Sequence, residues 1–343
     1  MKEALKSLRI VAVLVTLTLF MGAGQVVAAE EVFEFKISVD TAPSAHRNQA
    51  LVIFNEELQK RSHGKLVPKY FHSGQLYKDV HVSKALRTGT VDMAVPGNWV
   101  LEGIDTSANI IMLPMFFGQP LKVTENLADG DFGKTVNERL GKKLGAISPG
   151  RWFWQAEIST FFKNKKVTKP EDFKGLKIRI AGGAVAATMY EAFGATAVLI
   201  AYPDVAMALM QGTVDGIGSA VKSVESGKLH EAGLNYCLLW RSSSSYYIPM
   251  VSLKFWNRLP PDFQKIFKEV WEEVVPRQRE LAHNEQREAQ KFLESKGMEF
   301  YQPSDQVLAK WREEIAMPFQ DKLIKELKMD PALVQMAKKA LGM

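Results

Sequence analysis

Runs of alternating and of helically spaced apolar residues follow one another along the chain. Apolar and polar residues alternate through 33–39, the pattern of a half-buried strand, and further short strands are predicted at 66–71 and 176–181. A helical pattern fills 48–61, and another helix is expected after the glycine pair at 182–183. Because strands that alternate with helices are typical of parallel sheets, the pattern predicts an α/β fold.

One seven-residue stretch occurs twice in similar surroundings. Segments 86–92 and 209–215 agree at five of seven positions, Leu-x-x-Gly-Thr-Val-Asp, and each ends a helical pattern. The glycine suits a helix C-cap, which needs a left-handed residue, and the short apolar stretch that follows suits a buried strand. The repeat favours two related α/β lobes, although a Leu-x-x-Gly spacing also arises by chance.

The C-terminal third has the apolar spacing of a long helix over 261–296. Pro276 is expected to kink or interrupt this helix, and Gly297 can cap its end. A helix of this length could brace both lobes. Its stripe of large apolar residues is interpreted as packing, and consists of Phe263, Ile266, Phe267, Val270, Trp271 and Val274.

The first residues have the composition of a targeting segment. Basic residues precede an apolar run at 10–22, and small residues at 27–29 suit signal-peptidase cleavage. We expect a signal peptide at 1–29 that is cleaved after Ala29 and exports the protein to the periplasm. Retention as an uncleaved anchor is the alternative.

Composition and motifs argue against several classes of function. The formal net charge of +6 is spread along the chain, so no nucleic-acid partner is expected. Cys237 is the one cysteine, the six histidines form no close ligand pair, and no nucleophile elbow, phosphate loop or dinucleotide fingerprint occurs. We therefore expect no catalytic activity, no cofactor and no metal. An exported enzyme or a sensory ligand-binding module are the alternatives from other classes.

Ligands of parallel sheets bind beyond the carboxyl ends of the strands. In this chain the predicted edge comprises 41–44, 96–99, 150–154, 179–183 and Ser219. Candidate ligand contacts are therefore expected among the residues that follow the predicted strands.

Six motifs follow one another along the chain, at 71–76, 85–92, 112–117, 169–180, 208–216 and 255–260. The most specific are Glu-Asp-Phe-Lys-Gly-Leu-Lys-Ile-Arg, which ends at Arg179, and Gln-Gly-Thr-Val-Asp-Gly, which begins at Gln211. In sequence and in order these motifs resemble the DctP-type solute receptors of tripartite ATP-independent periplasmic (TRAP) transporters.

The resemblance implies a two-lobe fold like that of periplasmic binding proteins, with mostly parallel sheets, a ligand cleft between the lobes and a long bracing C-terminal helix. Lobe 1 is expected at 30–150 with a return segment at about 246–275, and lobe 2 at 151–245 with the C-terminal helices of 276–343. The resemblance also implies a small organic-acid ligand and delivery to TRAP membrane subunits. We expect the receptor to be a monomer.

Arg179 matches the arginine that grips the ligand carboxylate in that family. The residues themselves agree with this role, because Arg179 lies near the end of a hydrophobic strand beside two glycines. A guanidinium offers a planar fork that binds a carboxylate bidentately. The alternative is a structural salt bridge with Asp204 or Asp215.

The remaining candidate ligand contacts are less strongly indicated. Relatives often have a second ligand-binding arginine near Arg151, but the spacing does not align cleanly, and an ion pair is the alternative. Trp152 and Trp154 share one strand face, which could wall the ligand or pack in the core. The other candidates lie at the predicted edge or on the return crossing: Asn98, Trp99, Ser219, Ser245 and Tyr247.

The character of these candidates indicates the class of ligand. Ser219 and Ser245 stand where many relatives have larger polar residues, whereas several aromatic residues remain. One arginine anchor with aromatic walls suits an aromatic or bulky monocarboxylate. The alternative is a C4-dicarboxylate, for which Arg151 could supply a second cation, or a sugar acid.

Overall fold

The computed structural model describes residues 31–343, of which Phe33–Met343 form one compact unit. The signal peptide predicted at 1–29 lies outside the described residues. Within that described part of the chain, no helix combines the length and apolar character needed to cross a bilayer.

The first sheet has five strands and contains the N-terminal strand. Strand β1 runs parallel to β2 and β3, with Ile37 paired to Tyr70 on one side and to Met93 on the other. A strand from much later in the chain, β12, inserts antiparallel between β3 and β4. In spatial order the strands are β2 (Leu66–Phe71), β1 (Phe33–Ser38), β3 (Met93–Ala94), β12 (Met250–Ser252) and β4 (Ala146–Ile147).

The second sheet has six strands, and Arg179 lies on β7, the strand next to the edge strand β8. Strand β7 is parallel to β8 and β9, whereas β6 is antiparallel to β9 and β10. In spatial order the strands are β13 (Glu299–Tyr301), β10 (Tyr236–Leu238), β6 (Ser159–Phe162), β9 (Gly216–Ser219), β7 (Lys177–Ile180) and β8 (Thr196–Leu199). The predicted α/β two-lobe fold is confirmed, and its sheets are mixed because one strand in each, β12 in the first and β6 in the second, runs antiparallel to both of its neighbours.

Helices connect the parallel strands, as the apolar pattern predicts. In the first sheet these are α2 (His46–Arg61) and α3 (Asp79–Thr88), and in the second α7 (Ala184–Ala192) and α8 (Val205–Met210). Both copies of the repeat form a helix, a glycine turn and a strand. Gly89 and Gly212 have φ of 71° and 69°, the left-handed conformation that glycine adopts without strain.

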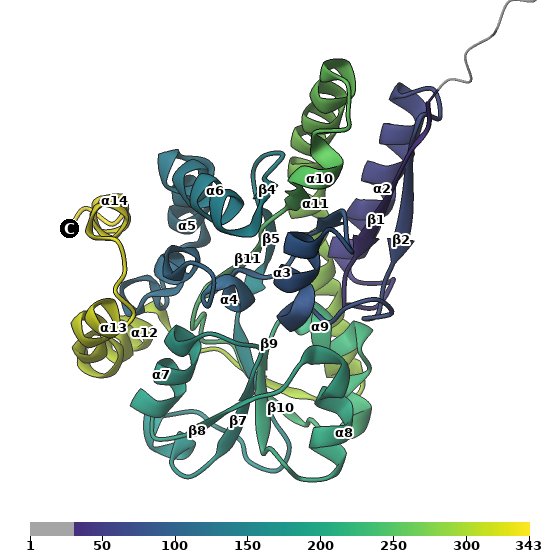
Figure 1. Cartoon of the computed structure of the whole chain (residues 1–343). Helices are drawn as coiled ribbons and strands as arrows, with labels where there is room; N and C mark the ends of the chain where they lie inside the picture. The colour runs from purple at the N-terminus through teal and green to yellow at the C-terminus, as the bar shows by residue number, and fades with distance from the viewer. Residues whose placement is uncertain (1–30) are drawn as a thin grey trace, which may run out of the picture. The chain divides into compact units, whose positions relative to one another are not determined.

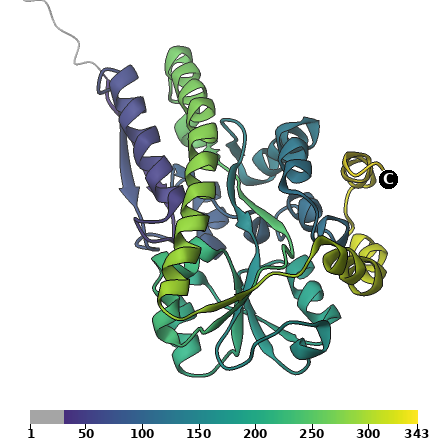
Figure 2. The ribbon, with the colours of Figure 1, turned by 180° about the vertical axis from the view of Figure 1, so that it is seen from behind.

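Two crossing strands and one long helix join the sheets. Strands β5 (Phe153–Glu157) and β11 (Ser244–Tyr247) pair antiparallel and run between the two sheets (Figure 1). Helix α11 (Pro261–Ser295) packs on α2, β5 and α9 (Val221–Ser226), so it contacts elements beside both sheets (Figure 2). The helix continues past Pro276, so the expected interruption is wrong; its stripe packs in the core, with Trp271 stacked on Phe153 at 4.3 Å.

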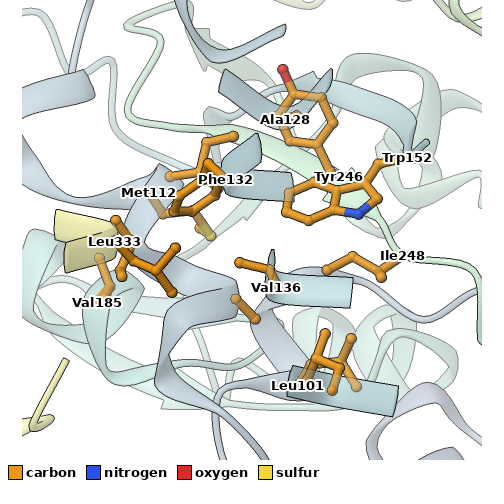
Figure 3. Packing of buried hydrophobic residues seen from close by; sticks show 14 of the residues in the cluster. Leu101, Met112, Ala128, Phe132, Val136, Trp152, Val185, Tyr246, Ile248 and Leu333 are labelled. Atoms are coloured by element: carbon orange, nitrogen blue, oxygen red, sulfur yellow. The ribbon is translucent and has the colours of Figure 1, made fainter. Parts of the chain in front are cut away.

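A third group of helices packs around the hydrophobic core shown in Figure 3. Helices α5 (Leu121–Asp129) and α6 (Asp131–Leu144) pack together and receive the last helix, α14 (Pro331–Ala340). The prediction grouped 276–343 with lobe 2, but α14 contacts helices of the 30–150 stretch, and the lobe boundaries stay a prediction. The remaining short helices are α4 (Asn98–Leu101), α10 (Leu253–Trp256), α12 (Asp305–Trp311) and α13 (Gln320–Glu326).

Candidate ligand-binding cleft

A cavity opens where the carboxyl ends of β1 and β7 face the crossing strands. It is lined by Asp40 and Thr41 after β1, by Arg179 and Gly182 at the end of β7, and by Tyr247 of β11, among others. Its empty volume is about 910 Å³, including the space at its open side. The cavity therefore lies at the edge where the strand-end rule predicts a ligand site.

Arg179 lines this cavity, and only part of its guanidinium is hydrogen-bonded to the protein. The side chain is 2% exposed, and its Nε donates a hydrogen bond of 2.8 Å to the carbonyl oxygen of Ile200. Within residues 31–343 neither terminal nitrogen, Nη1 or Nη2, has a hydrogen-bond or ion-pair partner. Burial lowers the pKa of Arg179 to about 10, with Tyr202, Asp40 and Tyr190 acting in the opposite direction. The group therefore stays charged at neutral pH, and its fork is available to an anion.

The alternative of a structural salt bridge for Arg179 is wrong. Asp204 pairs with Lys78, whose Nζ lies 2.7 Å from Oδ2, and Asp215 accepts a hydrogen bond from the backbone N–H of Lys177 at 2.8 Å. Both carboxylates have other partners, so neither neutralises Arg179.

A buried ionic cluster forms part of the cavity wall on the side of the first sheet. Arg47 is fully buried, with Nη1 2.7 Å from Asp79 Oδ2 and Nη2 2.8 Å from Asp40 Oδ1, and its guanidinium carbon lies 4.2 Å from the ring centroid of Tyr247. Asp40 and Asp79 also line the cavity. Burial raises the pKa of Asp79, against the opposing effect of Arg47 and with a further rise from Asp40. No local sequence pattern indicates this cluster, because its members come from α2, the segment after β1 and the start of α3.

Hydroxyl groups form much of the remaining wall. The phenol of Tyr202 donates to the carbonyl oxygen of Ser223 at 2.7 Å, and Tyr190 exchanges a 2.9 Å hydrogen bond with Thr160. The apolar part of the wall includes Trp99 and Met112. The lining side chains that carry a hydroxyl are Thr41, Tyr190, Tyr202, Ser219, Ser223, Ser242, Ser243, Ser245 and Tyr247.

The cavity brings together five of the nine residues predicted as ligand contacts: Arg179, Trp99, Ser219, Ser245 and Tyr247. Each of these residues lies near the carboxyl end of a strand at the predicted edge or on the crossing strand β11. The other four do not line the cavity, and each has a different partner.

Arg151 is engaged outside the cavity. Its Nε lies 2.5 Å from Oε2 of Glu272 on α11, and its Nη1 lies 3.7 Å from Oδ2 of Asp129. The ion-pair alternative was therefore correct, and Arg151 adds no second cation to the cleft. Among the described residues that line the cavity, Arg179 is the one basic side chain.

The two tryptophans face the core rather than the ligand. The Nε1 of Trp152 donates to Asn137 at 2.7 Å, and its ring packs in the core of Figure 3. Trp154 stacks on His283 with 4.2 Å between ring centroids. Strand alternation puts both rings on one face, but it does not say which face meets the cleft.

Asn98 is likewise structural. It is fully buried, donates to the carbonyl oxygen of Ala108 and to Oδ1 of Asn109, and accepts from the backbone N–H of Tyr246 at 3.1 Å. All its polar atoms are satisfied by the protein, and the structure does not place Asn98 among the residues that line the cavity.

Comparison with known proteins finds a solute-binding family and several solute-binding relatives. The DctP model, described as bacterial extracellular solute-binding protein, family 7, matches residues 37–326. The C4-dicarboxylate-binding periplasmic protein DctP of Rhodobacter capsulatus is 27% identical over 323 residues, covering 93% of this chain and 95% of its own. The 2,3-diketo-L-gulonate-binding periplasmic protein YiaO of Escherichia coli is 25% identical, covering 77% and 79%.

A solved structure of the same fold is that of the sugar acid binding protein DctPAm from Advenella mimigardefordensis, in complex with galactonate. It superimposes with a TM-score of 0.84 at 21% identity, over 90% of this chain and 99% of that one. At this identity the likeness concerns the fold.

Proposed function

The chain belongs to the DctP family of bacterial extracellular solute-binding proteins, and we propose that it captures a small hydroxylated organic acid. The observation that carries the proposal is the buried guanidinium of Arg179, which faces the cavity with both terminal nitrogens unpaired. A buried charge without a partner is costly, and a carboxylate that enters the cavity removes that cost.

The rest of the lining supports a ligand with hydroxyl groups. Asp40 and Asp79 offer carboxylate oxygens on the wall made by the first sheet, and the serine and tyrosine hydroxyls can donate or accept. The aromatic acid favoured from the sequence loses support, because Trp152 and Trp154 pack away from the cavity. The ligand class therefore moves to the sugar-acid alternative.

A C4-dicarboxylate is the second candidate. The relative from Rhodobacter capsulatus, which is named for binding C4-dicarboxylates, aligns over nearly the whole chain. A second carboxylate would have to rest on hydroxyls, since Arg151 is paired with Glu272 and the terminal nitrogens of Arg47 are bonded to Asp40 and Asp79. We rank this candidate below a hydroxylated monocarboxylate for that reason.

Capture proceeds by hinge closure in this proposal. The carboxylate binds Arg179 of the second sheet, the lobes rotate about β5, β11 and α11, and the cleft loses water. Micromolar affinity needs about −8 kcal/mol. Charge-assisted hydrogen bonds contribute about 1.5–3 kcal/mol each, and burial of apolar ligand surface adds about 25 cal/mol per Å².

The cellular part of the proposal follows the family resemblance. The receptor works in the periplasm after export by its signal peptide, as a monomer, and delivers the acid to TRAP membrane subunits. It does so without a cofactor and without chemical change of the ligand.

A ligand panel tests the proposal. Thermal unfolding of the protein is measured with D-galactonate, D-glucuronate, succinate and benzoate, and each acid that raises Tm is titrated by calorimetry. We expect galactonate or glucuronate to stabilise most, and NMR of the incubated acid to show no product. Stabilisation by benzoate alone would restore the aromatic ligand, and stabilisation by succinate alone the C4-dicarboxylate. Product formation would indicate an enzyme.

A further inference from the structure

A glutamate reaches across the rim of the cleft and holds the first turn of the helix that follows Arg179. Glu102, just after α4, accepts hydrogen bonds from the backbone N–H of Ala184 at 2.6 Å and of Val185 at 3.5 Å, where α7 begins. The first peptide N–H groups of a helix have no partner within the helix, and the positive end of the helix dipole favours a carboxylate there. Glu102 thus caps an element of the second sheet from the side of the first.

The backbone after Arg179 is shaped for this contact. Gly182 and Gly183 have φ of 154° and 86°, a region that L side chains rarely adopt. A Cβ on Gly183 would lie 2.7 Å from Nδ2 of Asn109 and 3.3 Å from Oε2 of Glu102, and one on Gly182 would lie 3.1 Å from the carbonyl oxygen of Trp99. Because glycine has no Cβ, the backbone just after β7 can approach Trp99, Glu102 and Asn109 this closely.

Hydrogen bonds continue from Glu102 to the crossing strand. Asn109 donates to Glu102 Oε2 at 2.7 Å and accepts from Asn98 at 3.0 Å, and Asn98 accepts from the backbone N–H of Tyr246 on β11. Asn109 and Asn98 are fully buried, so this chain of amides fixes the Glu102 carboxylate relative to the strand about which the lobes would turn.

A second contact crosses another part of the rim. Lys78 Nζ lies 2.7 Å from Asp204 Oδ2, with Lys78 at the start of α3 and Asp204 before α8. Both neighbourhoods line the cavity, through Asp79 on one side and Tyr202 on the other. The two side chains are 37% and 53% exposed, so this pair contributes less than Glu102 and is screened by salt.

We propose that Glu102 is a positioning residue that clasps the two lobes shut, with the Lys78–Asp204 pair as a weaker second clasp. The clasp rests on the proposed function, because it acts on the closed cleft. Opening of the lobes breaks the two hydrogen bonds that Glu102 accepts from Ala184 and Val185. It provides no other partner in the geometry that Asn109 fixes for the Glu102 carboxylate. These contacts favour the closed state differentially, which is the condition for shifting the equilibrium. Glu102 therefore slows ligand release while making no contact with the ligand.

Release kinetics test the clasp. Stopped-flow displacement measures the dissociation of the acid that stabilises the protein most in the panel. We expect Glu102→Ala to release it at least tenfold faster, because hydrogen bonds to a charged group are lost, with association changed less than threefold. Glu102→Gln, which keeps one acceptor oxygen, lies in between. Lys78→Ala changes release less than threefold, and high salt removes its effect.

A control on the same helix isolates the clasp from general damage to α7. Glu191 is exposed on α7, so Glu191→Ala should release ligand at the wild-type rate. A merely structural role for Glu102 predicts a lower Tm of the ligand-free protein with an unchanged release rate. That result, or equal release by Glu102→Ala and Glu191→Ala, would overturn the proposal.

A ligand-free measurement separates the clasp from the ligand assignment. Spin labels at Lys84→Cys and Lys174→Cys, both exposed, report the distance between the lobes, since Cys237 is buried and escapes labelling. Adding Glu102→Ala should shift the distance distribution to longer values whether or not any acid binds. If no acid binds but this shift occurs, the ligand assignment fails and the clasp stands. An unchanged distribution contradicts the clasp.

Discussion

Replacement of Arg179 tests the central feature of the cleft. Arg179→Met removes the guanidinium and keeps much of the volume, and Arg179→Lys keeps the charge but loses the planar fork. The two free terminal nitrogens allow one bidentate carboxylate contact. Each charge-assisted bond contributes about 1.5–3 kcal/mol. Two such bonds correspond to about 3–6 kcal/mol, so we expect about 100–10,000-fold weaker binding for Arg179→Met, and at least about tenfold for Arg179→Lys.

The same structure predicts a small effect on folding. Arg179 has one hydrogen bond to the protein, from Nε to Ile200, and no acidic partner among residues 31–343. The loss of that bond is offset by relief of the cost of burying an unpaired charge. The free energy of unfolding of the ligand-free Arg179→Met protein should therefore change by less than about 2 kcal/mol.

Calorimetric titration with the acid chosen from the panel gives the affinities, and urea unfolding gives the stabilities. Arg151→Ala is the matched control, because Arg151 is ion-paired with Glu272 outside the cavity and should leave affinity within about twofold of wild type. Unchanged affinity of the Arg179→Met protein would refute the proposal that Arg179 binds the ligand carboxylate. A large loss of ligand-free stability would indicate a structural partner instead.

Three further outcomes follow from the buried groups. Arg47→Met leaves Asp40 and Asp79 unpaired, so urea unfolding should show a loss of about 3–5 kcal/mol; a loss below about 1 kcal/mol contradicts the ionic cluster. Burial raises the pKa of Asp79, so ionisation as pH rises places negative charge at the cavity wall and should weaken binding of an anionic acid. Calorimetry between pH 5 and 9 should show this fall, and Asp79→Asn should flatten it; affinity that rises with pH refutes the assignment. Burial also raises the pKa of the Cys237 thiol, so a disulfide reagent at pH 8 should label it only after unfolding.

Most secondary-structure elements could be predicted from the sequence because they depend on local patterns. The alternation at the start of the chain gives β1, the repeated Gly-Thr-Val-Asp gives two helix–turn–strand units, and the long apolar stripe gives α11. Arg179 could also be identified as a candidate ligand contact from the sequence, because a basic residue near the end of an apolar strand lies at the edge where ligands bind.

Which side chains meet in space was decided by the tertiary structure. Arg151 and Glu272 are 121 residues apart, and the side of β5 that faces the core depends on where α11 packs. The Arg47 cluster and the Glu102 contact likewise join elements that have no local signal in common. The periodicity of one segment indicates which of its residues are buried and which of them share a face. The choice of partner for a buried charge depends on how distant segments pack, so only the folded chain determined it.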